Sequence, residues 1–199
     1  MKTIIQDFRA SFMAVLVLSL VCCGAYPLAV YGVAQAIFPR QANGSLVTDA
    51  SGTNVLGSAL LGQQFTGDDY FNSRPSAAGN GYDATSSGGS NLGPTSQKLR
   101  DAIKDRIAAY RKQNNLPDSE PVPADAVTAS ASGLDPHISP RNAELQLPRV
   151  AKARGLSVET VRKLVQQHTD QPDFGLLGSP GVNIFLLNQA LDQLKSPGK

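Results

Sequence analysis

The sequence predicts a helix-rich α+β soluble domain with short strands, attached to one N-terminal transmembrane helix. Residues 10–38 contain no charged side chain, and this stretch exceeds the roughly 20 apolar residues that a helix needs to cross a bilayer. The chain beyond Arg40 is polar and rich in glycine and proline, as expected of a domain in water. After residue 94, apolar residues recur with the helical period, whereas shorter apolar runs before it resemble strands.

The apolar stretch divides the chain into a cytoplasmic N-terminus, a transmembrane helix and an extracytoplasmic soluble domain, at residues 1–9, 10–38 and 39–199. Basic residues favour the cytoplasmic side of a span. Lys2 and Arg9 precede the helix, and only Arg40 follows it closely. We therefore expect the N-terminus to lie in the cytoplasm and the domain to lie in a periplasm-like space.

A cleaved signal peptide is the alternative to a retained anchor. Ala34-Gln35-Ala36 fits the small-residue pattern of a cleavage site. A signal peptide has an apolar region of only about 7–15 residues, however, and the apolar stretch here is longer. Its length favours the retained anchor.

Small residues mark one face of the expected span. They lie at helical spacing, at Ala25, Ala29, Gly32 and Ala36. Such a face lets another membrane helix approach closely, so we interpret it as a helix-packing surface. Pro27 removes a backbone donor within the span and is expected to kink it.

Composition narrows the function of the domain. The chain carries 18 Lys and Arg against 16 Asp and Glu. This near-neutral balance argues against a nucleic-acid surface, which needs a positive excess. The only cysteines, Cys22 and Cys23, fall within the span, so no disulfide is expected in the domain.

The first part of the domain contains short apolar runs and a long loop. Residues 55–62 read as one or two strands with glycine punctuation. Residues 77–94 form a loop too long for an ordinary connector. Thr95 or Ser96 can then cap a helix, whose expected inward positions are Leu99, Ile103, Ile107 and Tyr110.

Helices dominate the remainder. Ser139 followed by Pro140 predicts a helix start, and Gly155 predicts its end, with Pro148 expected to bend or divide it. A second helix is expected from Ser157, with inward residues Val158, Val161, Leu164 and Val165. A short strand at residues 182–184 leads into the last helix, with inward residues Leu187, Ala190, Leu191 and Leu194.

Three patterns suggest chemistry. A glycine-rich loop at residues 87–94 could approach a phosphate, but it matches neither nucleotide-binding fingerprint, and a packing turn explains it better. Asp135 and His137 could form the acid–base pair of a hydrolase. No third ligand at suitable spacing accompanies them, so a metal site is not expected.

Residues 149–158 superficially resemble a helix-turn-helix, with two expected helices, a turn at Gly155 and several basic residues. A DNA reader would need a cytoplasmic domain and a positive surface. Charges on a helix surface are the simpler interpretation.

Several motifs, taken in order, resemble one family along nearly the whole chain. They comprise residues 41–46 (QANGSL), 57–63 (GSALLGQ), 70–71 (YF), 74–76 (RPS), 87–91 (SGGSN), 127–135 (VTASASGLD), 149–154 (RVAKAR), 182–184 (VNI) and 187–192 (LNQALD). The order is similar to that in the C subunit of the Kdp potassium-transporting P-type ATPase.

The resemblance implies an accessory subunit of an ATP-driven potassium uptake complex in the bacterial inner membrane. Its partners would be a channel-like, potassium-selecting subunit, a P-type ATPase subunit and the lipid bilayer, with no nucleic acid. It would stabilise assembly and act as a catalytic chaperone that raises the ATP affinity of the pump subunit.

An extracytoplasmic domain would meet little ATP, so we expect that effect to be indirect. No stably bound cofactor is expected, and ATP would act through the complex. If nucleotide contacts this chain directly, the candidate residues are Ser87, Gly88, Gly89, Ser90, Asn91 and Gln146. Gln146 is otherwise expected on a helix surface or at an interface. A membrane-anchored periplasmic hydrolase using His137 and Asp135 stays as the alternative function.

Overall fold

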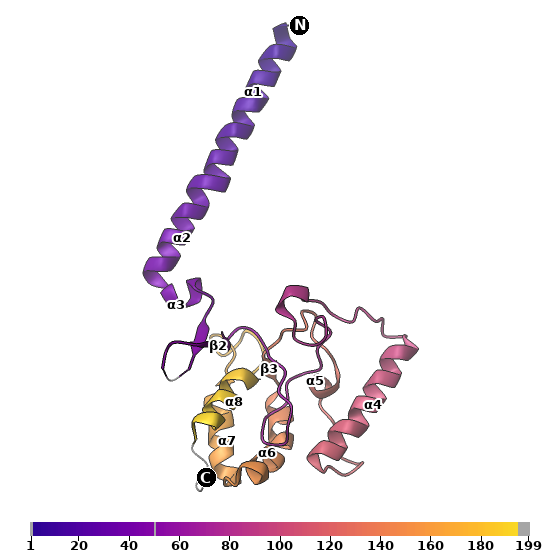
Figure 1. Ribbon diagram of the computed structural model, residues 1–199. Helices are drawn as coiled ribbons and strands as arrows, with labels where there is room; N and C mark the ends of the chain where they lie inside the picture. The colour runs from indigo at the N-terminus through magenta and orange to yellow at the C-terminus, as the bar shows by residue number, and fades with distance from the viewer. Residues whose placement is uncertain (1, 50, 195–199) are drawn as a thin grey trace. The chain divides into compact units, whose positions relative to one another are not determined.

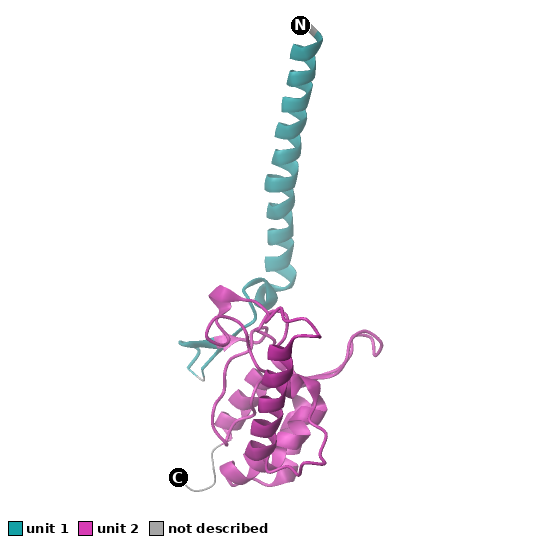
Figure 2. Cartoon of the chain, turned by 90° about the vertical axis from the view of Figure 1, so that its right-hand side faces the viewer, with its two compact units in different colours: residues 1–56 teal, residues 57–199 magenta. Residues whose placement is uncertain are grey.

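A computed structural model of the protein describes residues 2–49 and 51–194 (Figure 1). The chain forms two compact units, residues 1–56 and 57–199 (Figure 2). Helices with short strands make up the second unit, and an apolar helix dominates the first. The expected α+β class with one N-terminal apolar helix is therefore confirmed.

The first unit begins with one long helical rod. Its parts are α1 (Lys2–Ser19), a π-helical turn η1 (Leu20–Ala25) and α2 (Tyr26–Ile37). Thr3–Ile37 is, within the part of the chain that the structure describes, the one helix long and apolar enough to cross a membrane. Its apolar side chains are exposed throughout, as a bilayer-facing surface requires.

The distortion expected at Pro27 takes the form of the π-helical turn just before it. The Tyr26 N–H donates to the carbonyl of Val21, five residues back. A proline ring clashes with the carbonyl four residues before it in a regular α-helix. A wider turn gives that ring room without ending the helix.

The first unit ends with α3 (Pro39–Ala42) and the strand β1 (Leu46–Thr48), which pairs with β2 (Val55–Ser58). No strand was predicted at β1, which lies in the polar stretch after Arg40. The turn between the strands is held by Asp49, whose carboxylate accepts from the Ser51 hydroxyl at 2.7 Å and the Asn54 side chain at 2.7 Å. These hydrogen bonds lower the pKa of Asp49 to about 2.

The second unit combines five α-helices with a small sheet, within the described residues. The helices are α4 (Gln97–Asn114), α5 (Ala124–Val127), α6 (Pro140–Arg154), α7 (Val158–Gln167) and α8 (Ile184–Gln193), with a 3-10 turn η2 (Ala84–Ser86). The sheet is antiparallel, in the order β3 (His137–Ile138), β5 (Gly181–Asn183) and β4 (Thr169–Asp170).

The hydrophobic core lies where α6, α7, α8 and β5 meet (Figure 1). It is built from aliphatic residues with one buried phenylalanine, Phe71, and includes Leu147, Val150, Val161, Val182 and Leu187. α4 contacts α5 and α6 rather than this centre, and accordingly Tyr110 is buried while Leu99, Ile103 and Ile107 are half-buried.

Helix starts follow the expected caps. The hydroxyls of Ser96, Ser139 and Ser157 accept from the backbone N–H three residues on, at 3.4, 3.2 and 3.1 Å, which satisfies a donor without a partner in the helix. Gly155 ends α6 in the left-handed conformation at φ 65°.

Three expectations about these helices need correction. α6 is not divided at Pro148, whose side chain faces solvent. Val158 is exposed because it occupies the first position of α7, outside the inward stripe. Leu194 is exposed because α8 has already ended at Gln193.

Candidate functional site

Two buried amide side chains fix the segment that follows Phe71. Asn188 on α8 accepts from the Phe71 N–H at 3.0 Å and donates to the Phe71 carbonyl at 2.9 Å. Gln146 on α6 does the same for Asn72, at 2.7 and 3.1 Å. Each amide thus replaces a neighbouring strand and satisfies a buried peptide group at both its donor and its acceptor.

Arg149, which is also on α6, holds the turn at residues 68–70 that precedes this segment. Its guanidinium donates to the carbonyls of Asp68 and Tyr70 at 2.8 and 3.0 Å, and to the side chains of Asn72 and Gln146 at 2.6 and 2.9 Å. Burial lowers the pKa of this guanidinium, yet an arginine stays protonated in proteins. One fixed charge therefore organises the whole turn.

Arg154 continues this arrangement. It lies over the Tyr70 ring, 4.7 Å from the centroid, and donates to Asp192 on α8 at 2.8 Å. Arg149 and Arg154 are therefore internal connections, not the helix-surface charges that the sequence suggested. The same contacts count against a helix-turn-helix, because these bases are turned into the domain instead of toward a phosphate backbone.

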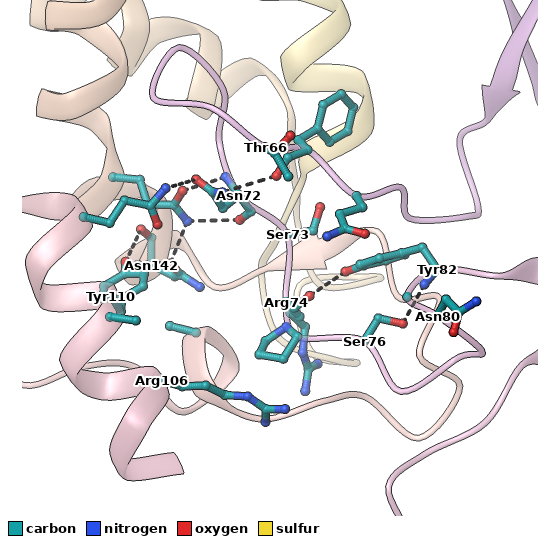
Figure 3. A pocket seen from close by; sticks show the side chains of 18 residues that line it. Thr66, Asn72, Ser73, Arg74, Ser76, Asn80, Tyr82, Arg106, Tyr110 and Asn142 are labelled. Atoms are coloured by element: carbon teal, nitrogen blue, oxygen red, sulfur yellow. Dashed lines mark hydrogen bonds between the residues drawn. The ribbon is translucent and has the colours of Figure 1, made fainter. Parts of the chain in front are cut away.

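A first pocket of about 380 Å³ lies between α4, α6 and the segment after Phe71 that the two amides hold (Figure 3). Its wall combines apolar and polar surface, and the polar or aromatic residues that line it include Asn72, Tyr82, Arg106, Tyr110, Asn142 and Gln146. The Tyr110 hydroxyl donates to Asn142 Oδ1 at 2.7 Å, and the Tyr82 hydroxyl donates to the Arg74 carbonyl at 2.8 Å. Burial raises the pKa of both tyrosines, so both stay protonated donors at neutral pH.

A second pocket of about 930 Å³ opens beside the small sheet, and Arg74 lines both pockets. Here Asp135 accepts from the Arg74 guanidinium at 2.8 Å and from the His137 backbone N–H at 2.9 Å. His137 Nδ1 lies 3.5 Å from Asp135 Oδ1, and Nε2 lies 2.8 Å from Asp170 Oδ2. The imidazole thus spans from β3 to β4 across Gly181 of β5, where an added Cβ would lie 3.3 Å from His137.

The charges of this second pocket shift the pKa values of two groups. Hydrogen bonds to Asp135 and Asp170 raise the pKa of His137 against the opposing effect of burial. Burial acts to raise the pKa of Asp135, but the hydrogen bonds from His137 and Arg74 outweigh it and lower that pKa. Both shifts favour the charged form, of the imidazole in His137 and of the carboxylate in Asp135.

This geometry does not build the hydrolase that the sequence left as the alternative function. A general base needs a free ring nitrogen facing the nucleophile's proton. Both ring nitrogens of His137 face carboxylates, and the nearby Ser139 hydroxyl donates to Asp125 at 2.9 Å. Asp135 and His137 do lie together, as the sequence suggested, but as parts of an ion-pair cluster.

The glycine-rich loop packs against the segment at residues 131–133. The Gly88 N–H donates to the Ser132 carbonyl at 2.9 Å, and the Ser87 hydroxyl donates to the same oxygen at 3.0 Å. A Cβ at Gly89 would lie 3.1 Å from the Ala131 carbonyl oxygen. Close packing therefore accounts for Gly89, whereas a Cβ at Gly88 or Gly93 would meet no atom within 4 Å.

The six candidate nucleotide residues do not come together. Gln146 lines the first pocket, whereas none of Ser87, Gly88, Gly89, Ser90 and Asn91 lines it. Gln146 is also only 1% exposed, and its amide forms hydrogen bonds to the Asn72 backbone and the Asn142 side chain. It therefore does not lie on an exposed helix surface.

The buried amides could have been found in the sequence. Gln146 follows Ala143 at helical spacing and precedes Val150 on the same face, so it interrupts an apolar stripe. Asn188 lies beside Leu187 and Leu191 in the same way. A polar residue inside such a stripe predicts a buried hydrogen-bonded group.

The fold and these sites define a class: a membrane-anchored protein, with an α+β domain carried by one apolar N-terminal helix. Residues 8–193 match the family described as KdpC, the c chain of the K+-transporting ATPase. The chain belongs to this family, and the resemblance seen in its motifs is confirmed.

Relatives with the same name cover nearly the full length. A protein of Nitratidesulfovibrio vulgaris is 54% identical over 188 residues, or 94% of this chain and 93% of its own. One of Mycobacterium tuberculosis is 57% identical over 169 residues, covering 85% and 88%. One of Geobacter metallireducens is 49% identical over 190 residues, covering 95% and 98%. Each is named potassium-transporting ATPase KdpC subunit.

Proposed function

We propose that this protein is an accessory subunit of an ATP-driven potassium uptake complex. It stabilises the assembly of a channel-like subunit with a P-type ATPase subunit, and it raises the ATP affinity of the latter without itself binding nucleotide. The observation that carries the proposal is the family match, which extends through both the apolar helix and the domain.

The structure supports an accessory role by what its polar groups do. Gln146, Asn188 and Arg149 are occupied with the chain's own peptide groups. His137 is held between two carboxylates. These groups hold the domain together, and the residues that the structure describes assemble no acid, base and nucleophile in one place, which favours a binding role over catalysis.

The membrane helix supplies one docking surface in this proposal. A Cβ at Gly32 would meet no atom of the chain within 4 Å. The face formed by Ala25, Ala29, Gly32 and Ala36 therefore has room for a helix of the channel-like subunit. The soluble domain lies on the periplasmic side of the bacterial inner membrane and covers that subunit's outer surface.

An indirect effect on ATP follows from this placement. The Gly88 N–H and the Gln146 amide, which would be needed for a phosphate or a base, already have partners within the domain. Coupling between distant sites of a complex typically changes an affinity about 5- to 150-fold. Packing between subunits is therefore sufficient to change the ATP affinity of the pump subunit without direct contact between this chain and ATP.

The test compares the purified complex with and without this subunit. Removing the chain should raise the KM for ATP of the remaining subunits at least about 5-fold, and adding it back should restore the original value. A KM for ATP that is the same with and without this chain would contradict its proposed effect on the ATP affinity of the pump subunit. Direct crosslinking of a photoreactive ATP analogue to residues 87–91 or Gln146 would contradict the indirect route.

A further inference from the structure

The connection between β4 and β5 presents an apolar tip that the domain itself does not use. Its residues 173–177, here called the Phe174 tip, include Phe174 at 93% exposure, Leu176 at 85% and Leu177 at 63%. Single exposed apolar residues are common. Three large ones within four positions form a concentrated patch of the kind that marks an interaction site.

The Phe174 tip is a preformed turn. The Asp173 and Leu177 peptide groups exchange two hydrogen bonds of 2.9 Å, and the Leu176 N–H also donates to the Asp173 carbonyl at 3.1 Å. A preformed loop loses little conformational entropy when it binds. Its three side chains are therefore presented at low entropic cost.

Backbone strain supports a role outside the domain. Phe174 has a φ of 54°, a left-handed conformation that is unfavourable for a bulky residue. Burial of the ring would offset that strain, but the ring is almost fully exposed. The hydrogen bonds of the turn hold this backbone, and the exposed ring is left available for contact with another molecule.

Charge identifies the kind of surface that covers the tip. Between residues 170 and 181 the only charged side chains are Asp170 and Asp173. Asp170 is paired with His137, which leaves Asp173 exposed beside the apolar patch. An anionic bilayer attracts Lys and Arg, not Asp. An apolar cavity edged by basic groups is complementary to this pattern.

We propose that the Phe174 tip docks in an apolar pocket with a basic rim on a partner subunit of the same transport complex. Phe174 is the central anchor, and the two leucines exclude water around it. This inference rests on the proposed function, because it takes the partner from that complex.

The first test replaces Phe174, Leu176 and Leu177 together by serine in the full chain, with the complex recovered in mild detergent through a tag on a partner subunit. Recovery of this chain should fall about tenfold. Leu60→Ser is the matched control, because Leu60 is 64% exposed in the same unit but lies outside the tip. That control should keep recovery within about twofold of the original.

Two further measurements determine whether the Phe174 tip contacts a partner subunit, phospholipid or a second copy of the chain. A benzophenone amino acid in place of Phe174 should crosslink to a partner subunit in native membranes. Asp173→Lys should lower recovery more than Asp173→Asn does, because it places a positive charge against the basic rim. Crosslinks only to phospholipid or to a second copy of the chain, or equal effects of the two Asp173 variants, would overturn the proposal.

The outcomes also distinguish this proposal from the broader one. If the unaltered chain is not recovered with the other subunits, the proposed function itself fails. If the unaltered chain is recovered and the triple serine variant is recovered equally well, the function stands and the Phe174 tip is not a docking site.

Discussion

At the scale of single residues, Gln146 and Asn188 form peptide-like pairs with successive backbone groups, Asn72 and Phe71. Both side chains are at most 1% exposed. A net intramolecular hydrogen bond contributes only about 1 kcal/mol, whereas a buried group left without a partner costs about 1–3 kcal/mol. The penalty of losing these side chains is therefore larger than the contribution that any one bond makes.

Gln146→Leu should lower the free energy of unfolding by about 2–3 kcal/mol, because the buried Asn72 N–H and carbonyl lose their partners. Urea unfolding of the full chain in mild detergent measures the loss. Gln166→Leu is the control, since Gln166 is exposed on α7 and its loss should cost less than about 0.5 kcal/mol. Equal losses in the two variants would show that Gln146 is not a backbone anchor.

His137 should make the stability of the domain depend on pH. Its folded pKa is raised by Asp135 and Asp170, so its contribution is fully present below the unfolded pKa of about 6.5 and is lost as pH rises through the folded value. Melting temperature should therefore fall as pH rises above that point.

His137→Gln should remove this fall and leave a flatter profile. His168→Gln is the control, because the His168 ring contacts the Leu164 carbonyl instead of a carboxylate, and it should keep the fall. Thermal melts between pH 5.5 and 8.5 provide the test, because this range extends from about one unit below to about two units above the unfolded pKa. Identical profiles for His137→Gln and the unaltered chain would contradict the assignment.

At the scale of elements, the helices were predictable because their signals are local. Ser96, Ser139 and Ser157 identify three helix starts, and Gly155 identifies one end. The sites were less predictable because they depend on long-range contacts. The hydrogen bond between Asn72 and Gln146 joins residues that are 74 positions apart in the sequence. The hydrogen bond between Phe71 and Asn188 joins residues that are 117 positions apart. No periodicity within one segment indicates such a pairing.

The difference between local signals and long-range contacts also explains where the sequence-based predictions needed correction. β1 is three residues long and exists because it pairs with β2, which the polar stretch around it does not indicate. Arg149 looks like a surface charge in sequence, since only the tertiary fold brings the carbonyls of Gly67, Asp68 and Tyr70 to it. Asp135 and His137 were correctly seen as neighbours because two positions in sequence suffice.

The membrane helix allows a prediction at the element scale. Ala29→Leu with Gly32→Leu should lower recovery of the complex about tenfold in mild detergent, because the added side chains block close helix approach. Val30→Leu is the control, since Val30 is already large and exposed and lies off the small-residue face. Unchanged recovery of the double variant would show that this face is not the docking surface.

At the scale of the whole molecule, two different physical environments shape the chain. The unit formed by residues 1–56 exposes apolar side chains along Thr3–Ile37, which is stable only in lipid or against other apolar helices. The unit formed by residues 57–199 buries an aliphatic core and pairs buried side chains such as Gln146 and Asn188 with its own backbone. The two units therefore differ in what stabilises them: apolar surroundings stabilise the first, and an internal core stabilises the second.

The side of the membrane on which the domain lies is the most direct test of this account. Ser119 is exposed in the domain, and Ser119→Cys, with Cys22 and Cys23 replaced by serine, provides a single labelling site. A membrane-impermeant maleimide should label this cysteine in intact cells whose outer barrier has been opened. Labelling only after the inner membrane is permeabilised would place the domain beside cytoplasmic ATP and contradict the proposed indirect role.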